Sequence, residues 1–117
     1  MDVKQHLIDQ LESFGFPVYL QGAMSRDEEY PPDFFTFWNN ETWGAGFFND
    51  EATRTVWDFD VNFYSDDPAH VSDYMAQARV KLKNAGFTVV GKGYDVLSDE
   101  ASHTGRGMNV LFMEKEE

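Results

Sequence analysis

Two aspartates provide the clearest candidate for chemistry in this chain. Asp58 and Asp60 are two positions apart in an alternating stretch, so both carboxylates point to one face of a predicted strand. Such a pair can share a divalent cation or perform acid–base work. No histidine or further acid stands at a spacing that completes a ligand set, which favours a solvated strand face. A small metal-dependent enzyme that uses Asp58 and Asp60 stays as one hypothesis.

The three histidines, His6, His70 and His103, show no metal-ligand spacing. We expect His6 and His70 to be exposed in the first turns of helices. His103 belongs to a polar loop that also holds Ser98, Ser102 and Asp99, and a Ser–His–Asp triad there is conceivable. Neighbours in sequence rarely supply a held base and an oxyanion hole. We therefore expect no catalytic residue, no metal and no cofactor.

Composition excludes several functional classes. The 117 residues suit one domain, and 9 Lys and Arg against 21 Asp and Glu give a net charge of −12. A phosphate-binding surface or a polybasic membrane anchor needs clustered cations, so we expect neither DNA recognition nor membrane binding. The chain has no cysteine, which excludes disulfides and thiolate chemistry. We expect no signal peptide and a protein made and kept in a cytosol, or in a particle assembled there.

The hydrophobic pattern predicts the elements that position these residues. The expected elements are helices at 2–14 and 68–85 and strands at 18–20, 34–38, 53–64, 87–90, 94–97 and 108–114. Gly91 and Gly93 predict a turn or bulge, and residues 39–51 and 98–107 are expected to be connections. This order, α-β-β-β-α-β-β, predicts an α+β domain over 1–117. Its sheet would be antiparallel or mixed, with both helices packed on one face.

Aromatic residues exceed the need of one small core. The chain has 11 Phe, 5 Tyr and 3 Trp, so some rings are expected on a contact surface. Trp43, Phe47 and Phe48 fall in the expected connection 39–51, which either folds back on the core or serves as a docking loop. Together with Trp38, they are the candidate residues of an interface with another subunit or partner.

Several stretches resemble the tail terminator proteins of long-tailed phages, also called tail completion or head–tail joining proteins. The resemblance covers roughly residues 30–114. It rests on PPDFFTFW at 31–38, YSDDP at 64–68, AGFTV at 85–89, GKGYD at 91–95 and HTGRG at 103–107. The family implies an α+β subunit that forms a hexameric ring in the virion, assembled in the cytoplasm of a bacterial host. The ring caps the head-proximal end of the tail tube, stops its polymerisation and docks to the head connector, and DNA crosses its bore.

The resemblance implies roles for further charged residues. An acidic bore would repel phosphate and let DNA slide. The candidate bore residues are Asp27, Glu28, Glu29, Asp99 and Glu100, although ordinary solvated loops are the simpler explanation. Arg106 is a candidate for an ion pair between subunits, or for a local structural pair.

The strong acidity also suits a second function. An acidic protein can mimic DNA and occupy a basic partner such as a nuclease or a repressor. Mimics space their carboxylates along an extended face, whereas the acids here are scattered among helix starts, loops and one strand. Competition with DNA for a basic partner would separate this alternative from the phage subunit.

Overall fold

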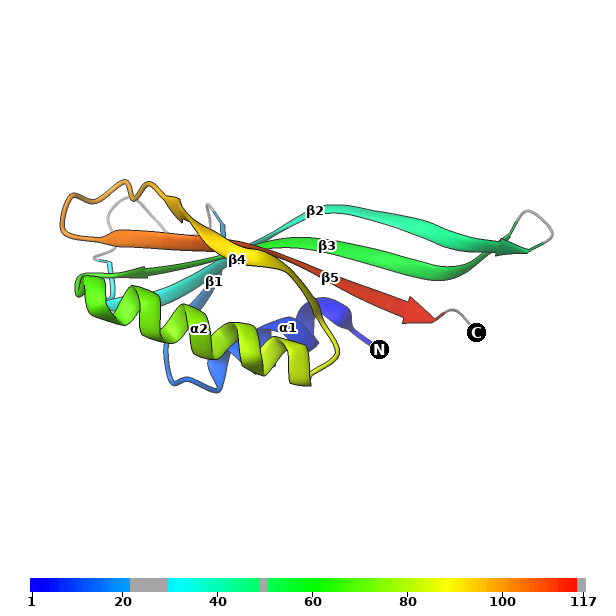
Figure 1. Cartoon of the computed structure of the whole chain (residues 1–117), viewed down its shortest axis with the longest axis horizontal. Helices are drawn as coiled ribbons and strands as arrows, with labels where there is room; N and C mark the ends of the chain where they lie inside the picture. Colours follow the sequence, from blue (N-terminus) through cyan, green and yellow to red (C-terminus); the bar gives the residue numbers. More distant parts are fainter. Residues whose placement is uncertain (22–29, 49–50, 116–117) are drawn as a thin grey trace.

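The sheet and helices follow the predicted order. The computed structural model describes residues 1–21, 30–48 and 51–115. The elements are α1 (Val3–Glu12), β1 (Val18–Leu20), β2 (Asp33–Phe48), β3 (Glu51–Ser65), α2 (Pro68–Asn84), β4 (Thr88–Val96) and β5 (Thr104–Lys115). The strand order is β1-β2-β3-β5-β4, with β1 parallel to β2 and the other neighbours antiparallel. Both helices lie on one side of the sheet (Figure 1), which confirms the α+β class with a mixed sheet.

An aspartate begins each helix. The Asp2 carboxylate accepts a hydrogen bond from the backbone N–H of Gln5, and the Asp67 carboxylate accepts one from the backbone N–H of Ala69, each at 3.0 Å. These bonds satisfy amides that have no partner within the helix. Pro68 occupies the first turn of α2, where its missing N–H costs nothing. Both helices end slightly earlier than the sequence predicts, at Glu12 and Asn84.

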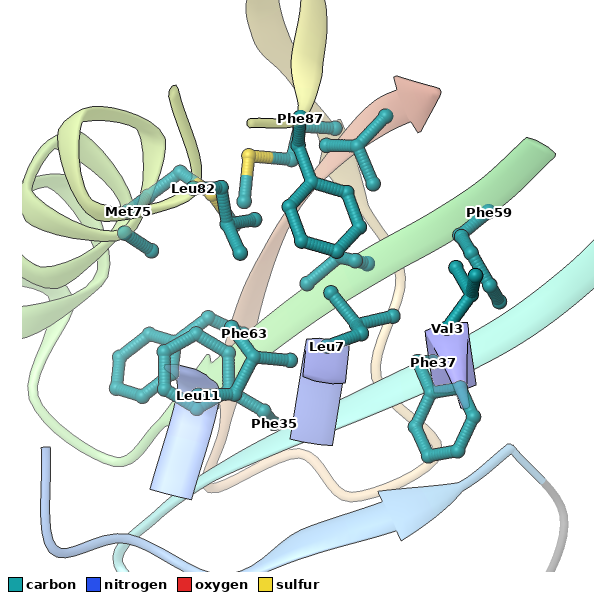
Figure 2. Close-up of a cluster of buried hydrophobic side chains, with 14 residues drawn as sticks. Val3, Leu7, Leu11, Phe35, Phe37, Phe59, Phe63, Met75, Leu82 and Phe87 are labelled. Carbon is teal, nitrogen blue, oxygen red and sulfur yellow. The ribbon is translucent and has the colours of Figure 1, made fainter. Parts of the chain in front are cut away.

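The core lies between the helices and one face of the sheet. Phe59, Val61 and Phe63 of β3 are fully buried there, which confirms the predicted alternation along this strand. Removing these rings and branched chains from water supplies the main stabilisation of the fold. The rest of the buried cluster is Val3, Leu7, Leu11, Phe35, Phe37, Met75, Ala78, Leu82, Phe87, Met108 and Val110 (Figure 2).

A long hairpin replaces the connection predicted over 39–51, and that prediction is wrong. β2 continues to Phe48 and β3 begins at Glu51, with paired residues along the whole length. Gly44, Gly46 and the neighbouring asparagines are poor strand formers, but the pairing of the two strands overrides their preference. We call residues 39–48 and 51–57 the arm.

The arm makes the molecule elongated. In the described part of the chain, β1 accompanies β2 along Phe35–Phe37, and β5 accompanies β3 from Arg54 onward. The end of the hairpin therefore projects from the body (Figure 1). The chain extends 53 × 28 × 22 Å with a radius of gyration of 15.3 Å. A compact chain of this length would have a radius of about 13 Å.

β5 also begins earlier than predicted, at Thr104, so the expected loop over 98–107 is too long. Glycines at 105 and 107 suggest a loop, but here they make room for neighbouring side chains. A Cβ at Gly105 would lie 2.7 Å from the ring of Tyr64. The bulge predicted at Gly91 and Gly93 is confirmed by a register shift between Val90 and Tyr94, and both glycines have positive φ.

Candidate interaction surface

The side of the sheet opposite the helices, which we call the helix-free face, carries exposed apolar side chains. Nine large hydrophobic side chains are exposed in the described part of the chain. The strand register places five of them on this face: Trp38, Trp43, Val90, Tyr94 and Met113. A concentration of exposed rings on one face of a small protein is typical of an interaction surface.

A β-bulge brings the two tryptophans to the same face. Trp38 and Trp43 are an odd number of residues apart, so a regular strand would point them to opposite sides. The register between β2 and β3 shifts between Asn39 and Glu41, and Asn40 is the extra residue. Trp38 then pairs with Asp60, and Trp43 with Val56, both on the helix-free face. Their side chains are 48% and 38% exposed, as expected for interface candidates.

The other two aromatic candidates, Phe47 and Phe48, are the last residues of β2. Phe47 pairs with Ala52 and Phe48 with Glu51, so both belong to the arm and not to a docking loop. Only their backbone lies within the described part of the chain.

Asp58 and Asp60 occupy the middle of the helix-free face. The side-chain amide of Asn109 donates to both carboxylates, at 2.5 Å to Asp58 and 3.4 Å to Asp60. Asn40 donates to Asp58 at 3.3 Å. Burial, followed by the charge of Asp60, raises the pKa of the nearby Tyr94. Amide donors thus engage this pair, and the described residues contain no group of three or more His, Asp or Glu able to hold a metal.

An aromatic pocket lies at the end of the helix-free face away from the arm. It encloses about 230 Å³. Its walls come from β1, the start of β2, the end of β3 and the start of the loop between β4 and β5. The Phe34 ring is its centre: it stacks on Tyr64 at 5.2 Å and meets Tyr19 and Tyr30 edge-on at 5.9 and 5.3 Å. Thr36 and Asp99 also line the pocket. We call these six residues the aromatic pocket.

The electrostatics of this pocket favour positive charge. Burial raises the pKa of Tyr64, and the charge of Asp99 adds to the effect. Burial and then the charges of Asp99 and Glu100 raise the pKa of Tyr30. Both hydroxyls therefore stay neutral, and Asp99 supplies negative potential at the rim. Rings that face an acid in this way attract cations.

Of the five acids predicted to face a bore, Asp99 and Glu100 are exposed in the segment before β5. Asp99 borders the aromatic pocket. Asp27, Glu28 and Glu29 lie outside the described residues. Whether any of them faces a bore stays a prediction.

Arg106 makes a local pair, one of the two possibilities left open by the sequence. Its guanidinium donates to the Asp95 carboxylate at 2.7 Å and to the Gly93 carbonyl at 3.1 Å. These bonds tie β5 to the bulge of β4. A contact of Arg106 with a neighbouring subunit stays a prediction.

His6 and His103 each bond to a backbone carbonyl of a distant segment. His6 is partly buried, contrary to prediction: its Nε2 bonds to the Ala85 carbonyl at 2.9 Å and its ring stacks on Phe87. His103 is buried, and its Nε2 lies 2.8 Å from the Pro31 carbonyl. A carbonyl only accepts, so Nε2 carries the hydrogen and Nδ1 accepts from the Ser102 hydroxyl at 2.8 Å. The orienting partner of His103 is thus a carbonyl and not the carboxylate of a triad.

No protein-family model matches this chain, and no curated protein matches its sequence. Within the described residues, no helix has the length and apolar character needed to cross a membrane.

Proposed function

We propose that this protein is a structural subunit of a phage virion that forms a hexameric ring at the head-proximal end of the tail tube. The ring ends tail polymerisation and joins the tail to the head connector, and DNA crosses its bore. The observation that carries the proposal is the arm, which extends the sheet beyond the body and presents Trp43 to solvent. The resemblance of residues 30–114 to tail terminators supports this proposed place in the virion.

The arm is poorly supported within one subunit. Two strands alone are marginally stable in water, and a third strand or a packed face is needed to hold them. In the described chain, no strand pairs with the outer edge of β2 beyond Phe37. An unpaired edge with exposed rings is a template for another chain. A neighbouring subunit that covers the arm would supply the missing support and would also cover the unpaired edge and its exposed rings.

The charge suits a passage for DNA. Each copy carries a net charge of −12, so a ring concentrates negative charge around its axis. Phosphates are repelled from such a wall and do not adhere to it, so DNA can move through the bore.

Light scattering across a concentration series, followed by negative-stain imaging, tests ring formation. We expect closed rings with a central hole. Trp43→Ser should weaken assembly about tenfold or more, because a central aromatic anchor at an interface contributes about 2 kcal/mol or more. Val80→Ser is the control, since Val80 is also an exposed apolar residue but lies on α2, on the other side of the molecule.

Addition of the protein to growing tail tubes tests its place in the virion. We expect it to bind one end of each tube and stop elongation. A wild-type protein that neither forms rings nor binds tube ends would contradict the proposal. If such a monomer also competed with duplex DNA for a basic protein, the DNA-mimic function would replace it.

A further inference from the structure

The aromatic pocket contains a polar group that lacks a partner. Thr36 is only 8% exposed, and its hydroxyl makes no hydrogen bond in the described part of the chain. A buried hydroxyl left in this state costs about 1–3 kcal/mol. The Thr36 and Asn62 side chains both face the Tyr64 hydroxyl, and they oppose the rise of its pKa. The Tyr64 side chain lines the pocket, and its hydroxyl oxygen can accept a hydrogen bond from a ligand.

The chemistry of this pocket selects a cationic donor. Aromatic faces attract a cation by their quadrupole, and a guanidinium also stacks on them. Asp99 at the rim adds an opposite charge. A guanidinium therefore matches the rings and the carboxylate, and it can also donate to the Tyr64 hydroxyl.

Within the described residues, Arg54 of the arm has no oxygen partner. Among the arginines of the described residues, Arg79 donates to the Gly91 carbonyl and Arg106 to Asp95. Arg54 instead makes a 3.7 Å contact with the sulfur of Met113. It also stands directly opposite Lys115 across β3 and β5, and like charges in that position repel. In a chain of net charge −12, this pair of cations is suited to an acidic partner.

The two features cannot meet within one subunit. Arg54 and Tyr64 lie on the same strand and on the same face, because β3 has an unbroken register with β5 between them. Ten residues of extended strand separate them, which is about 33 Å. Donor and pocket are therefore complementary surfaces at opposite ends of one molecule.

We propose that the aromatic pocket of each subunit receives the Arg54 guanidinium from the arm of a second copy. This inference rests on the proposed ring and names one of its contacts. The contact is heterologous, since each copy gives an arm at one end and a pocket at the other. Repetition of such a contact produces a ring when the rotation closes and a filament when it does not.

Self-association of two single variants tests the contact. Arg54→Ala removes the donor and leaves the pocket, whereas Asp99→Lys places a repelling cation at the pocket and leaves the arm. Each variant alone should self-associate about tenfold or more weakly than the wild type. The controls are Lys92→Ala and Asp73→Lys, which make the same charge changes at exposed positions. Tyr64→Phe, which keeps the ring, should weaken association by a smaller factor.

Mixing the two variants gives the decisive result. The intact arm of Asp99→Lys fits the intact pocket of Arg54→Ala, but neither partner offers a second working surface. We expect the equimolar mixture to form dimers and nothing larger, as measured by analytical ultracentrifugation. Variants that assemble as well as the controls, or a mixture no more associated than its components, would overturn the contact.

The outcomes separate this contact from the proposed function. Rings or capped tubes formed equally by both variants overturn the contact and leave the function in place. A wild type that associates through this contact into open filaments, and does not bind tube ends, leaves the contact and overturns the function. A wild type that neither associates nor binds tube ends overturns both.

Discussion

His70 links the ionisation of one side chain to the stability of the fold. Its Nδ1 lies 3.1 Å from Asp33 at the start of β2, and its Nε2 lies 3.6 Å from Asp67 at the start of α2. The hydrogen bond to Asp33 raises the pKa of His70 above the usual 6.5, and the charge of Asp67 adds to it despite partial desolvation. The charged form is thus favoured by folding. Its contribution is complete below pH 6.5 and is lost as the pH rises through the raised pKa.

The expected outcome is a pH-dependent effect of His70→Gln. The variant should lower the urea midpoint more at about pH 5.5 than at about pH 8.5, since the wild-type advantage exists only with charged His70. The imidazole is substantially exposed, so we expect a small difference. An equal loss at both pH values would show that His70 acts by packing on Tyr74 and not by its charge.

Gly105 is a residue whose lack of a side chain shapes the aromatic pocket. A Cβ there would lie 2.7 Å from the ring of Tyr64 and 2.7 Å from Val96. Both neighbours would have to move, so Gly105→Ala should lower the free energy of unfolding by about 1–3 kcal/mol. Thr104→Val, at an exposed position of the same strand, should change it by less than about 0.5 kcal/mol. Chemical denaturation of both variants measures the difference, and equal stabilities would contradict this account.

At the scale of elements, the arm is the least supported part of the sheet. At its end, residues 45–48 and 51–53 pair with no third strand in the described part of the chain. We therefore expect amides of residues 45–48 and 51–53 to exchange with solvent much faster than those of residues 59–63 in the monomer. Assembly should slow the arm amides and leave the core amides unchanged. Hydrogen exchange of monomer and ring measures this, and an arm equally exposed in both states would contradict its role in assembly.

The elements also show how far a sequence pattern can predict structure. Phe59, Val61 and Phe63 alternate with polar residues because one face of β3 is buried, and that pattern predicts the strand. Residues 39–48 of the arm show no strict alternation of polar and apolar residues, and Gly44 and Gly46 suggest a loop. Its pairing depends on a partner strand that a local pattern does not reveal.

One of the two candidate surfaces could be predicted in part from the sequence, and the other could not. Trp38 and Trp43 could be selected by residue type alone, although their common face depends on the bulge at Asn40. The aromatic pocket could not be predicted, because Tyr19, Tyr30, Phe34 and Tyr64 come from separate segments. The only signal of it in the sequence is the excess of aromatic residues over the need of one core.

At the scale of the whole molecule, two electrostatic effects would oppose each other in the proposed assembly. Copies of net charge −12 repel over long range, whereas the proposed contact between Arg54 and the aromatic pocket attracts at short range. Salt screens the first effect more strongly, because charges in close contact are separated by less than a Debye length. That length falls from about 30 Å at about 10 mM salt to about 8 Å at about 150 mM. We therefore expect self-association to tighten, by about tenfold, as NaCl rises over this range, and then to level off.

Sedimentation across the NaCl series measures this dependence. Lys92→Ala, which makes each copy more negative without touching the contact, should show a steeper rise with salt than the wild type. Arg54→Ala makes the same charge change, so both variants experience equal long-range repulsion. A constant difference in association between Arg54→Ala and Lys92→Ala across the NaCl series therefore measures the lost contact. A wild type that associates less tightly as salt rises would mean that attraction between unlike patches outweighs the net charge. The acidity of the chain would then not limit assembly at low salt.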